Sequence, residues 1–526
     1  MKYYIINLRG KVVESNNIYE KMPFLEKDTD FALDRFFILK EKLINRQKTR
    51  RILIRMHSDF QAYPGQLEEI YRYLQDLKDA GKEMYFYAKT YNLKELYLAS
   101  LCQHRIIPAD GSIIHYGLSL GNIYLKNLLD KLNIQADIYR RGKYKGAADA
   151  FRVSSMDDAQ KEANSLLLKR IAEVMENTIR ENIRVDLDFI QELKAGTFYK
   201  ADEAIAKGIV TQNDYWYNLV KSWEDEKLKK DQVVVKKMYT GKGYKIAVLS
   251  FEGNIVDGAN KKIPLMGNSC GDDFYVDEIS RLAKNKAVRA MVFKVNSGGG
   301  SASASAEIAN ALEKLQDKKP LVVVQSGIAG SGGYYISFPA EKIFTQYSTI
   351  TGSIGVIYLL FFAKYFMEKY GITRSTIKDG EHADLLSSWR ERDDEEKAMI
   401  MNQIDYIYDT FTAKVAKNRN MDQEEVNKIG QGRVWSGYDA VEAKICDELG
   451  GLGNALAYLK DKLDMESVKL EFFPKPKRNL LKTLLGSGSA EGITILEQLN
   501  LLGGIKEFNS KPLCYTEELL MLDFRL

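Results

Sequence analysis

Apolar residues recur along the chain in short runs that alternate with longer amphipathic stretches. The segments "KYYIINLRGKVVES" (residues 2–15) and "RILIRMHSDF" (51–60) each open with a run rich in β-branched or aromatic residues and then break at polar or glycine residues. The second break is followed by the apolar spacing of a helix. The same order recurs at "AMVFKVNSGG" (290–299). Strands alternating with amphipathic helices predict an α/β layer fold with right-handed crossovers.

The longest apolar run, "VIYLLFFA" (356–363), has eight residues, whereas a membrane-spanning helix needs roughly 20. We therefore expect a buried core strand there, the alternative being that the run lines or rims a site for an apolar substrate. The first ten residues, "MKYYIINLRG", reach an arginine and a glycine after eight residues. This pattern is typical of a first strand and not of an export signal or an anchor.

The two halves of the chain resemble each other. Residues 2–15 align with "KIAVLSFEGNIVDG" (245–258), and both segments have the pattern of strand, glycine turn and strand. Further pairs follow in the same order, namely 51–60 with 290–299, 138–151 with 376–389, and 196–210 with 432–446. The difference in residue number between aligned positions falls only from 243 to 236 along the chain. This regularity predicts a tandem duplication of one α/β domain.

The duplication and the length of 526 residues predict more than one domain. We expect an N-terminal repeat over 1–226, a lysine-rich connection over 227–244 and a C-terminal repeat over 245–470. A C-terminal extension over 471–526 has proline, lysine, glycine and serine in the proportions of a linker.

Composition excludes several classes of function. Basic and acidic residues nearly balance, 76 against 72, so charge does not favour a nucleic-acid partner. The four cysteines lie far apart without a CxxC pair, and the four histidines lack HExxH spacing. These patterns predict free thiols and neither a metal site nor a histidine triad. We expect no cofactor.

The two repeats differ where chemistry is expected. Ser331 lies among glycines in "GIAGSGGYYIS" (327–337), whereas the aligned position of the first repeat is Lys94. Conversely, Lys145 of the first repeat aligns with Ala383. Only the second repeat therefore has the serine and only the first has the lysine, which predicts one composite site formed by both repeats.

A serine paired with a lysine is an established alternative to the histidine triad. The serine hydroxyl needs a base, and a buried lysine serves if its neutral amine is populated. Glycine lets backbone N–H groups approach an oxyanion closely, and "GGG" (298–300) and "SGG" (331–333) offer such groups. Taken singly, each motif is more often an ordinary turn or helix start.

In combination these motifs resemble those of the long-form bacterial signal peptide peptidases, or protease IV, which are serine–lysine peptidases of the ClpP/crotonase-like superfamily. The resemblance covers nearly the whole chain. The family runs "VNSPGGS", "ASGGYWIS", "TLTGSIG" and "YKSAVEPF" correspond to "VNSGGGS" (295–301), "GSGGYYIS" (330–337), "TITGSIG" (349–355) and "YKGAADAF" (144–151).

The resemblance implies a tandem ClpP/crotonase-like fold, a ββα superhelix, with one composite active site. It implies Ser331 as nucleophile, Lys145 as general base and Ser353 as the residue that orients the lysine. Gly332 with Gly299 or Gly300 is implied as the oxyanion donor set.

The implied activity is an endopeptidase that degrades hydrophobic peptides, such as cleaved signal peptides, through an acyl-enzyme. A homotetramer is implied, with peptides and no nucleic acid as partners. The family is membrane-associated, but the expected N-terminal anchor is missing, so we expect a protein that is soluble or peripheral to the bacterial inner membrane. Two other departures are Gly298 in place of the usual proline and the absence of proline and glutamate after Lys145.

Two alternatives remain open from the sequence. A crotonase-type acyl-CoA enzyme would explain the glycine-rich loops but not the division of serine and lysine between the repeats. A catalytically degenerate scaffold that binds peptides would explain the fold but would leave Ser331 unreactive toward an acylating probe.

Overall fold

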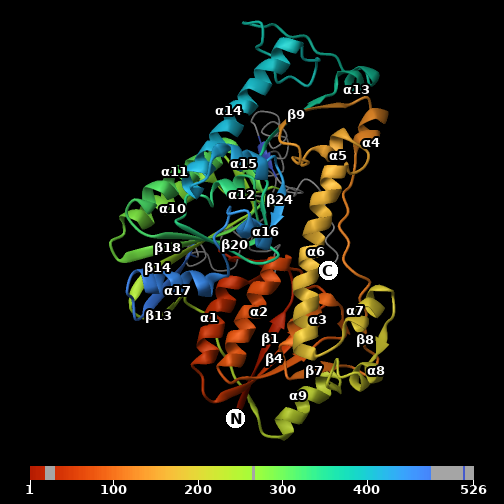
Figure 1. Cartoon of the computed structure of the whole chain (residues 1–526), viewed down its shortest axis with the longest axis vertical. Helices are drawn as coiled ribbons and strands as arrows, with labels where there is room; N and C mark the ends of the chain where they lie inside the picture. Colours follow the sequence, from red (N-terminus) through yellow and green to blue (C-terminus); the bar gives the residue numbers. More distant parts are fainter. Residues whose placement is uncertain (18–29, 264–266, 476–512, 516–526) are drawn as a thin grey trace, which may run out of the picture.

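The computed structural model describes residues 1–17, 30–263, 267–475 and 513–515. The molecule is elongated (Figure 1): most of the first half of the chain, red to yellow, occupies one end, and the second half, green to blue, lies beside it and extends into an arm. Residues 126–152 of the first half, orange, lie against this arm. Most of the predicted C-terminal extension, 471–526, lies outside the described residues.

The first half is built on a parallel sheet with the strand order β11-β7-β5-β4-β1-β12. Its strands are β1 (Lys2–Leu8), β4 (Thr49–Met56), β5 (Glu83–Tyr87), β7 (His104–Ile107), β11 (Gln212–Asn213) and β12 (Lys229–Lys230). The main helices that connect or cover them are α1 (Leu33–Ile44), α2 (Pro64–Asp79), α3 (Leu93–Ser100) and α9 (Trp216–Asp225). Central strands of such a sheet are covered on both faces, which is why their apolar runs are nearly continuous.

The second half repeats this order in the path β25-β21-β20-β18-β14-β26, to which β13 adds an antiparallel edge. Its strands are β13 (Tyr239–Gly241), β14 (Tyr244–Glu252), β18 (Val288–Ser297), β20 (Leu321–Gly330), β21 (Lys342–Thr345), β25 (Glu448–Leu449) and β26 (Val468–Phe473). Two shorter strands extend the sheet at its side, β22 (Ile350–Gly352), which pairs with β20, and β24 (Val434–Ser436), which pairs with β22. The predicted domain end at residue 470 thus falls inside β26.

Residues of the predicted connection 227–244 contribute β12 to the first sheet and β13 to the second. The helices of the second half include α10 (Asp272–Lys284), α11 (Ala302–Gln316), α12 (Gly332–Tyr335), α15 (Gln423–Ile429), α16 (Gly437–Glu442) and α17 (Leu452–Lys462).

A third sheet, of seven strands, draws on distant parts of the chain in the order β16-β17-β15-β19-β27-β23-β9. The strands are β9 (Gln135–Arg141), β15 (Asn254–Val256), β16 (Lys261–Ile263), β17 (Gly267–Gly271), β19 (Gly299–Ser301), β23 (Val356–Phe362) and β27 (Leu513–Tyr515). Strand β9 of the first half runs antiparallel to β23 of the second over the full length of β23. The predicted buried strand at 356–363 is therefore confirmed, since all but one residue of β23 are buried.

Two long helices, α6 (Asp158–Ile183) and α14 (Asp394–Arg419), connect the arm to the rest of the molecule (Figure 1). The smaller elements are β2 (Val12–Val13), β3 (Phe31–Ala32), β6 (Thr90–Tyr91), β8 (Ser112–Ile113), β10 (Tyr199–Lys200), α4 (Lys126–Lys131), α5 (Asp149–Arg152), α7 (Leu187–Lys194), α8 (Ala201–Ala206) and α13 (Lys364–Lys369).

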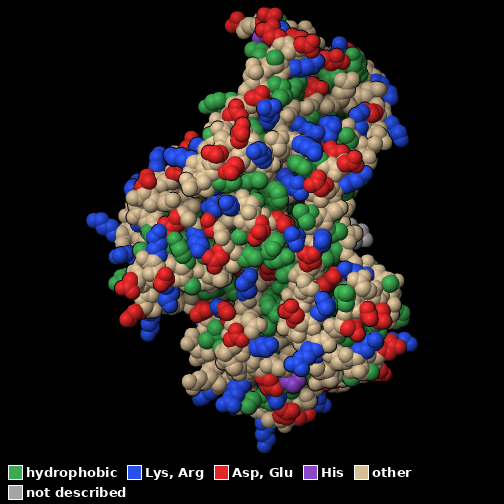
Figure 2. Space-filling view, in the orientation of Figure 1, with side chains coloured by type: hydrophobic (Ala, Val, Ile, Leu, Met, Phe, Trp, Pro, Cys, Tyr) green, Lys and Arg blue, Asp and Glu red, His purple; other side chains and the backbone are tan. Residues whose placement is uncertain are grey.

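Apolar side chains of both halves share one core. A single cluster of buried residues joins Ile6 and Ile54 of the first sheet to Ile246 and Val292 of the second. Lysine, arginine and acidic side chains of both signs are interspersed over the face in Figure 2, as the balanced composition predicts. None of the helices formed by the described residues combines the length and the apolar character that crossing a membrane requires.

Candidate active site

Ser331 lies at the junction between β20, which ends at Gly330, and α12, which begins at Gly332. Its backbone adopts φ +54° and ψ −116°, and its amide donates to the Gly352 carbonyl at 2.8 Å. Positive φ is unusual for a residue with a side chain and carries strain. Ser331 is completely buried. The strand-to-helix turn therefore holds the hydroxyl in one place.

Lys145 reaches this serine from the other half of the chain. Its Nζ donates to Ser331 Oγ at 2.7 Å and to Ser353 at 3.1 Å, through both the carbonyl and Oγ of that residue. The lysine side chain is among the largest that the structure buries completely, with 1% exposure. The structure thus brings together the three side chains that the sequence predicts as nucleophile, base and orienting residue.

The stem of Lys145 runs through a passage walled by glycines. A Cβ at Gly432 would lie 2.5 Å from Lys145 Cβ, and a Cβ at Gly355 would lie 3.1 Å from Lys145 Cδ. Any side chain at Gly432 would displace the lysine, and the residue also has φ +74°. Sequence analysis missed this role, although both glycines belong to the aligned segments "TITGSIG" and "GRVWSGYDA".

The loop that carries Lys145 is anchored by a buried carboxylate. Asp149 accepts hydrogen bonds from Arg152 Nε at 2.6 Å, from Gln160 Nε2 at 2.7 Å and from Arg140 at 3.3 Å. Arg140 also donates to the Lys145 carbonyl at 3.2 Å. This carboxylate therefore ties the end of β9, the lysine loop and α6 together.

The predicted oxyanion glycines lie close to the serine. Gly332 begins α12, where backbone N–H groups have no partner within the helix. A Cβ on Gly332 would lie 3.1 Å from Gly299 Cα, so the two loops touch. Gly300 has φ +149° and passes so near β15 that its Cβ would lie 2.1 Å from the Ile255 carbonyl oxygen. The Gly299 amide already donates to Ser297 Oγ at 3.1 Å.

A carboxyl group supports the strand below this loop. Glu252 accepts hydrogen bonds from the Glu14 amide at 2.8 Å and from Asn296 Nδ2 at 3.2 Å. Burial, together with the neighbouring Glu14 carboxylate, raises the pKa of Glu252 to about 8. Because Asn296 leads into the glycine loop, its hydrogen bond to Glu252 supports the base of that loop.

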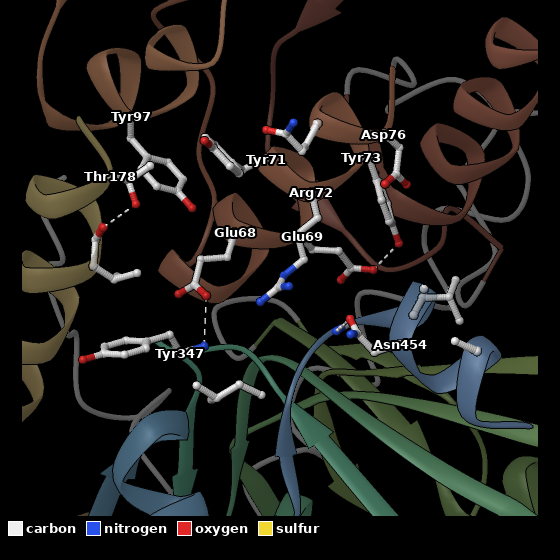
Figure 3. Close-up of a pocket in the computed structure, with 17 residues that line it drawn as sticks. Glu68, Glu69, Tyr71, Arg72, Tyr73, Asp76, Tyr97, Thr178, Tyr347 and Asn454 are labelled. Atoms are coloured by element: carbon white, nitrogen blue, oxygen red, sulfur yellow. Dashed lines mark hydrogen bonds between the residues drawn. The ribbon is translucent and has the colours of Figure 1, made fainter. Parts of the chain in front are cut away.

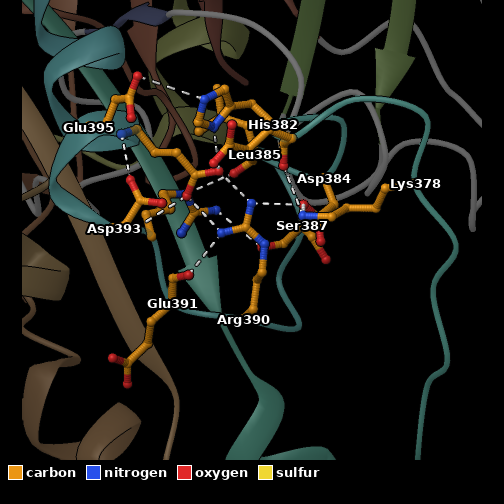
Figure 4. A network of polar contacts seen from close by, with 12 residues as sticks. Lys378, His382, Asp384, Leu385, Ser387, Arg390, Glu391, Asp393 and Glu395 are labelled. Carbon is orange, nitrogen blue, oxygen red and sulfur yellow. Dashed lines mark hydrogen bonds and ion pairs between the residues drawn. The ribbon is translucent and has the colours of Figure 1, made fainter.

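The counterpart positions of the two repeats have other roles. Lys94 lies on α3, where its Nζ donates to the Phe60 carbonyl at 2.9 Å. Ala383 lies in the segment that leads to α14, between His382 and Asp384 in the sequence, and these two residues belong to the polar network of Figure 4. There Arg390 binds both Asp384 and Glu396 and lowers the pKa of Glu396 to about 2. This network ties the segment before α14 to the first turn of that helix.

A cavity of about 690 Å³ lies elsewhere, between α2 and the second sheet (Figure 3). Its lining includes Glu68, Arg72, Tyr97 and Asn454. Glu68 accepts the backbone N–H of Tyr347 at 2.9 Å, so the cavity belongs to the contact between the two halves. The lining includes neither Ser331 nor Lys145.

Comparison with known proteins places this geometry in context. The model of peptidase family S49 matches residues 76–252 and 313–466. The chain is similar to the chloroplastic serine protease SPPA of Arabidopsis thaliana, at 28% identity over 84% of this chain and 69% of that protein. It is 29% identical to Protease 4 of Haemophilus influenzae over 78% of this chain and 70% of the relative. It is 32% identical to the putative signal peptide peptidase SppA of Enterococcus faecium over 47% of this chain and 72% of the relative.

Proposed function

The chain belongs to peptidase family S49 and is a serine peptidase, and from that premise we propose that Ser331 and Lys145 form its catalytic dyad. The observation that carries the proposal is the 2.7 Å contact between Lys145 Nζ and Ser331 Oγ. Two side chains from different halves of the chain meet in a fully buried position, one of them on a strained turn.

The proposed reaction is acyl transfer. Neutral Lys145 takes the proton of the Ser331 hydroxyl while Oγ bonds to the carbonyl carbon of the scissile peptide. The carbonyl oxygen becomes an oxyanion, which the backbone N–H of Gly332 and a donor from the 298–300 loop stabilise. Lys145 then protonates the leaving amine, and water hydrolyses the acyl-enzyme.

Burial favours the neutral amine that this step needs, because removal from water disfavours the charged ammonium form. The Ser353 carbonyl and hydroxyl hold Lys145 Nζ at 3.1 Å, so the amine lone pair has a fixed direction. The Gly299 amide donates to Ser297 Oγ, so that contact competes with an oxyanion for this amide. Ser353 is accordingly a positioning residue in this proposal.

We also propose that the composite site arose by duplication. Family membership and the mixed α/β architecture agree with the ClpP-like fold class expected from the sequence. The duplication itself is supported by the matching strand order of the two parallel sheets. Under this proposal the first repeat, 1–226, supplies the lysine and the second, 245–470, supplies the serine and the glycine loops.

The proposed substrates are hydrophobic peptides such as cleaved signal peptides, as the name of the Enterococcus faecium relative suggests for that protein. A homotetramer with peripheral contact to a membrane is the proposed assembly. The comparisons identify peptidases and give no support to the acyl-CoA alternative.

The test is hydrolysis of an apolar fluorogenic peptide against pH by the wild type, Ser331→Ala and Lys145→Ala. We expect both variants to lose at least about a thousandfold in kcat, because neither dyad member works alone. The wild-type rate should rise with pH as the lysine amine becomes neutral. Matched controls are Ser337→Ala, a buried serine six residues further along the chain, and Lys143→Ala, an exposed lysine two residues before Lys145. Activity that survives in either dyad variant would contradict the proposal.

A further inference from the structure

Strand β20 is irregular just before the nucleophile. The two residues of β18 that flank Asn296 pair with Gln325 and Ala329 of β20. Residues 326–328 therefore lie opposite Asn296 alone, which makes a bulge in β20. The bulge ends three residues before Ser331. Bulges change the direction of the side chains around them and are frequent next to active sites.

The side chain of Asn296 bridges this bulge. Its Oδ1 accepts the backbone N–H of Ile328 at 3.0 Å, so a side chain takes the place of the interrupted strand pairing. Its Nδ2 donates to Glu252 of β14 at 3.2 Å. Asn296 is 6% exposed, and a buried main-chain N–H without an acceptor is unfavourable. The amide thus serves as acceptor and donor at once, which an apolar side chain of the same size cannot do.

The same residue leads into the glycine loop, 298–300. The Asn296 carbonyl accepts the Gly253 amide at 3.0 Å. The next residue, Ser297, donates through Oγ to the Gly253 carbonyl at 2.7 Å and accepts the Gly299 amide at 3.1 Å. Asn296 is therefore bonded to the strand that carries the nucleophile and lies at the base of the loop that carries the oxyanion donors.

The first half of the chain packs against the bulge. A Cβ at Gly327 would lie 2.7 Å from Tyr63 Cβ, and a Cβ at Gly65 would lie 2.4 Å from the Ser326 carbonyl oxygen. Glycine inside a strand often marks a bulge or a close approach of another part of the chain. The start of α2 is therefore in direct contact with the bulge, which is held by the first half as well as by Asn296.

We propose that Asn296 is a positioning residue that fixes the distance between the Ser331 hydroxyl and the glycine loop. This inference rests on the proposed function. The oxyanion forms only as Ser331 attacks, so this distance matters more for the transition state than for the bound peptide. Loss of the Asn296 amide is therefore expected to lower kcat and to leave KM nearly unchanged.

Asn296→Leu tests the inference, because it keeps the size of the side chain and removes both hydrogen-bonding groups. We expect kcat for the apolar peptide to fall about a hundredfold, as a displacement of about 1 Å at a catalytic group would cause, with KM changed less than about threefold. A peptide boronate forms a tetrahedral adduct on a nucleophilic serine. Its inhibition constant should rise by the factor by which kcat/KM falls.

The matched control is Asn285→Leu. Asn285 Oδ1 also accepts a backbone amide at 3.0 Å, but in the turn that follows α10, and this variant should have wild-type kcat. Thermal unfolding of each variant shows that the assay temperature lies below its transition. If the leucine variant at 296 is insoluble, Asn296→Ser repeats the measurement with a milder change, and we expect kcat to fall about tenfold.

A folded variant at position 296 with wild-type kcat would overturn the inference. A rise in KM with unchanged affinity for the boronate would overturn it as well. Ser331→Ala, in the same assay, separates this result from the proposed function. Activity of Ser331→Ala would contradict the dyad itself, whereas an inactive Ser331→Ala beside a fully active Asn296→Leu would contradict only the role of Asn296.

Discussion

At the scale of single residues, the position of the Lys145 amine depends on the lack of neighbouring side chains around the lysine's aliphatic stem. Lys145 contacts glycines where any other residue would place a Cβ, and the closest of these is Gly432. The amine itself has three hydrogen-bonding contacts, one to Ser331 and two to Ser353. A glycine at position 432 is thus as necessary for the position of the Lys145 amine as Ser331 and Ser353 are.

Gly432→Ala is therefore expected to lower kcat by about a hundredfold, since a displacement of about 1 Å at a catalytic group has that effect. The matched control is Gly371→Ala. Gly371 has the same φ of +74° but has no atom within 4 Å of the position of a Cβ, so it shares the backbone strain without the collision. The measurement is kcat and KM for peptide hydrolysis alongside thermal unfolding. Equal activity of the two variants would show that the lysine passage tolerates a methyl group.

At the scale of elements, the sequence predicted those strands and helices that depend on residues close together in the chain. The strand "LVVVQS", the glycines around Ser331 and the following helical pattern lie within one short stretch, and the structure forms β20 and α12 there. The passage around Lys145 was not predicted, because a glycine such as Gly432 has an ordinary local explanation in a turn. Its role arises only when β9 pairs with β23 and brings the lysine loop to it. Similarly, no local pattern places β27 beside β19.

The loop between β9 and α5 offers a test at this scale. Asp149→Ala removes the acceptor for Arg152, Gln160 and Arg140, and the last of these also holds the Lys145 carbonyl. Of these donors Gln160 is buried, and a buried donor left without a partner costs about 1–3 kcal/mol in stability. We expect a loss in this range and a fall of at least tenfold in kcat, with KM changed less.

Asp130→Ala serves as the control for that variant, because Asp130 forms an exposed ion pair with Lys126 on neighbouring α4 and such pairs contribute about 0–1 kcal/mol. Urea denaturation and steady-state kinetics measure both quantities. If Asp149→Ala were destabilised while kcat stayed at the wild-type value, the carboxylate would stabilise the fold without positioning the lysine.

At the scale of the whole molecule, the composite site requires the two halves to keep a fixed relation. A buried ion cluster lies between them. Lys294 of β18 contacts Glu14 and Glu69 of the first half, each at 2.8 Å, and the three side chains are 3% exposed or less. Lys294 lies two residues before Asn296 on the strand that leads to the oxyanion loop. A displacement of this ion cluster would therefore also displace Gly299.

Replacement of this lysine tests how tightly the halves are coupled. Lys294→Met leaves two carboxylates buried without their cation, and breaking a buried pair in this way costs about 3–5 kcal/mol. We expect a lower urea midpoint and, because the strand leads to the glycine loop, a lower kcat under native conditions. Lys342→Met is the control, since its partner Glu448 is about half exposed and the loss should be at most about 1 kcal/mol. Tryptophan fluorescence follows both halves, through Trp216 and Trp223 in the first and Trp389 and Trp435 in the second. If Lys294→Met matched Lys342→Met in midpoint and kcat, the buried cluster would not hold the two halves of the active site together, and the shared apolar core would have to do so alone.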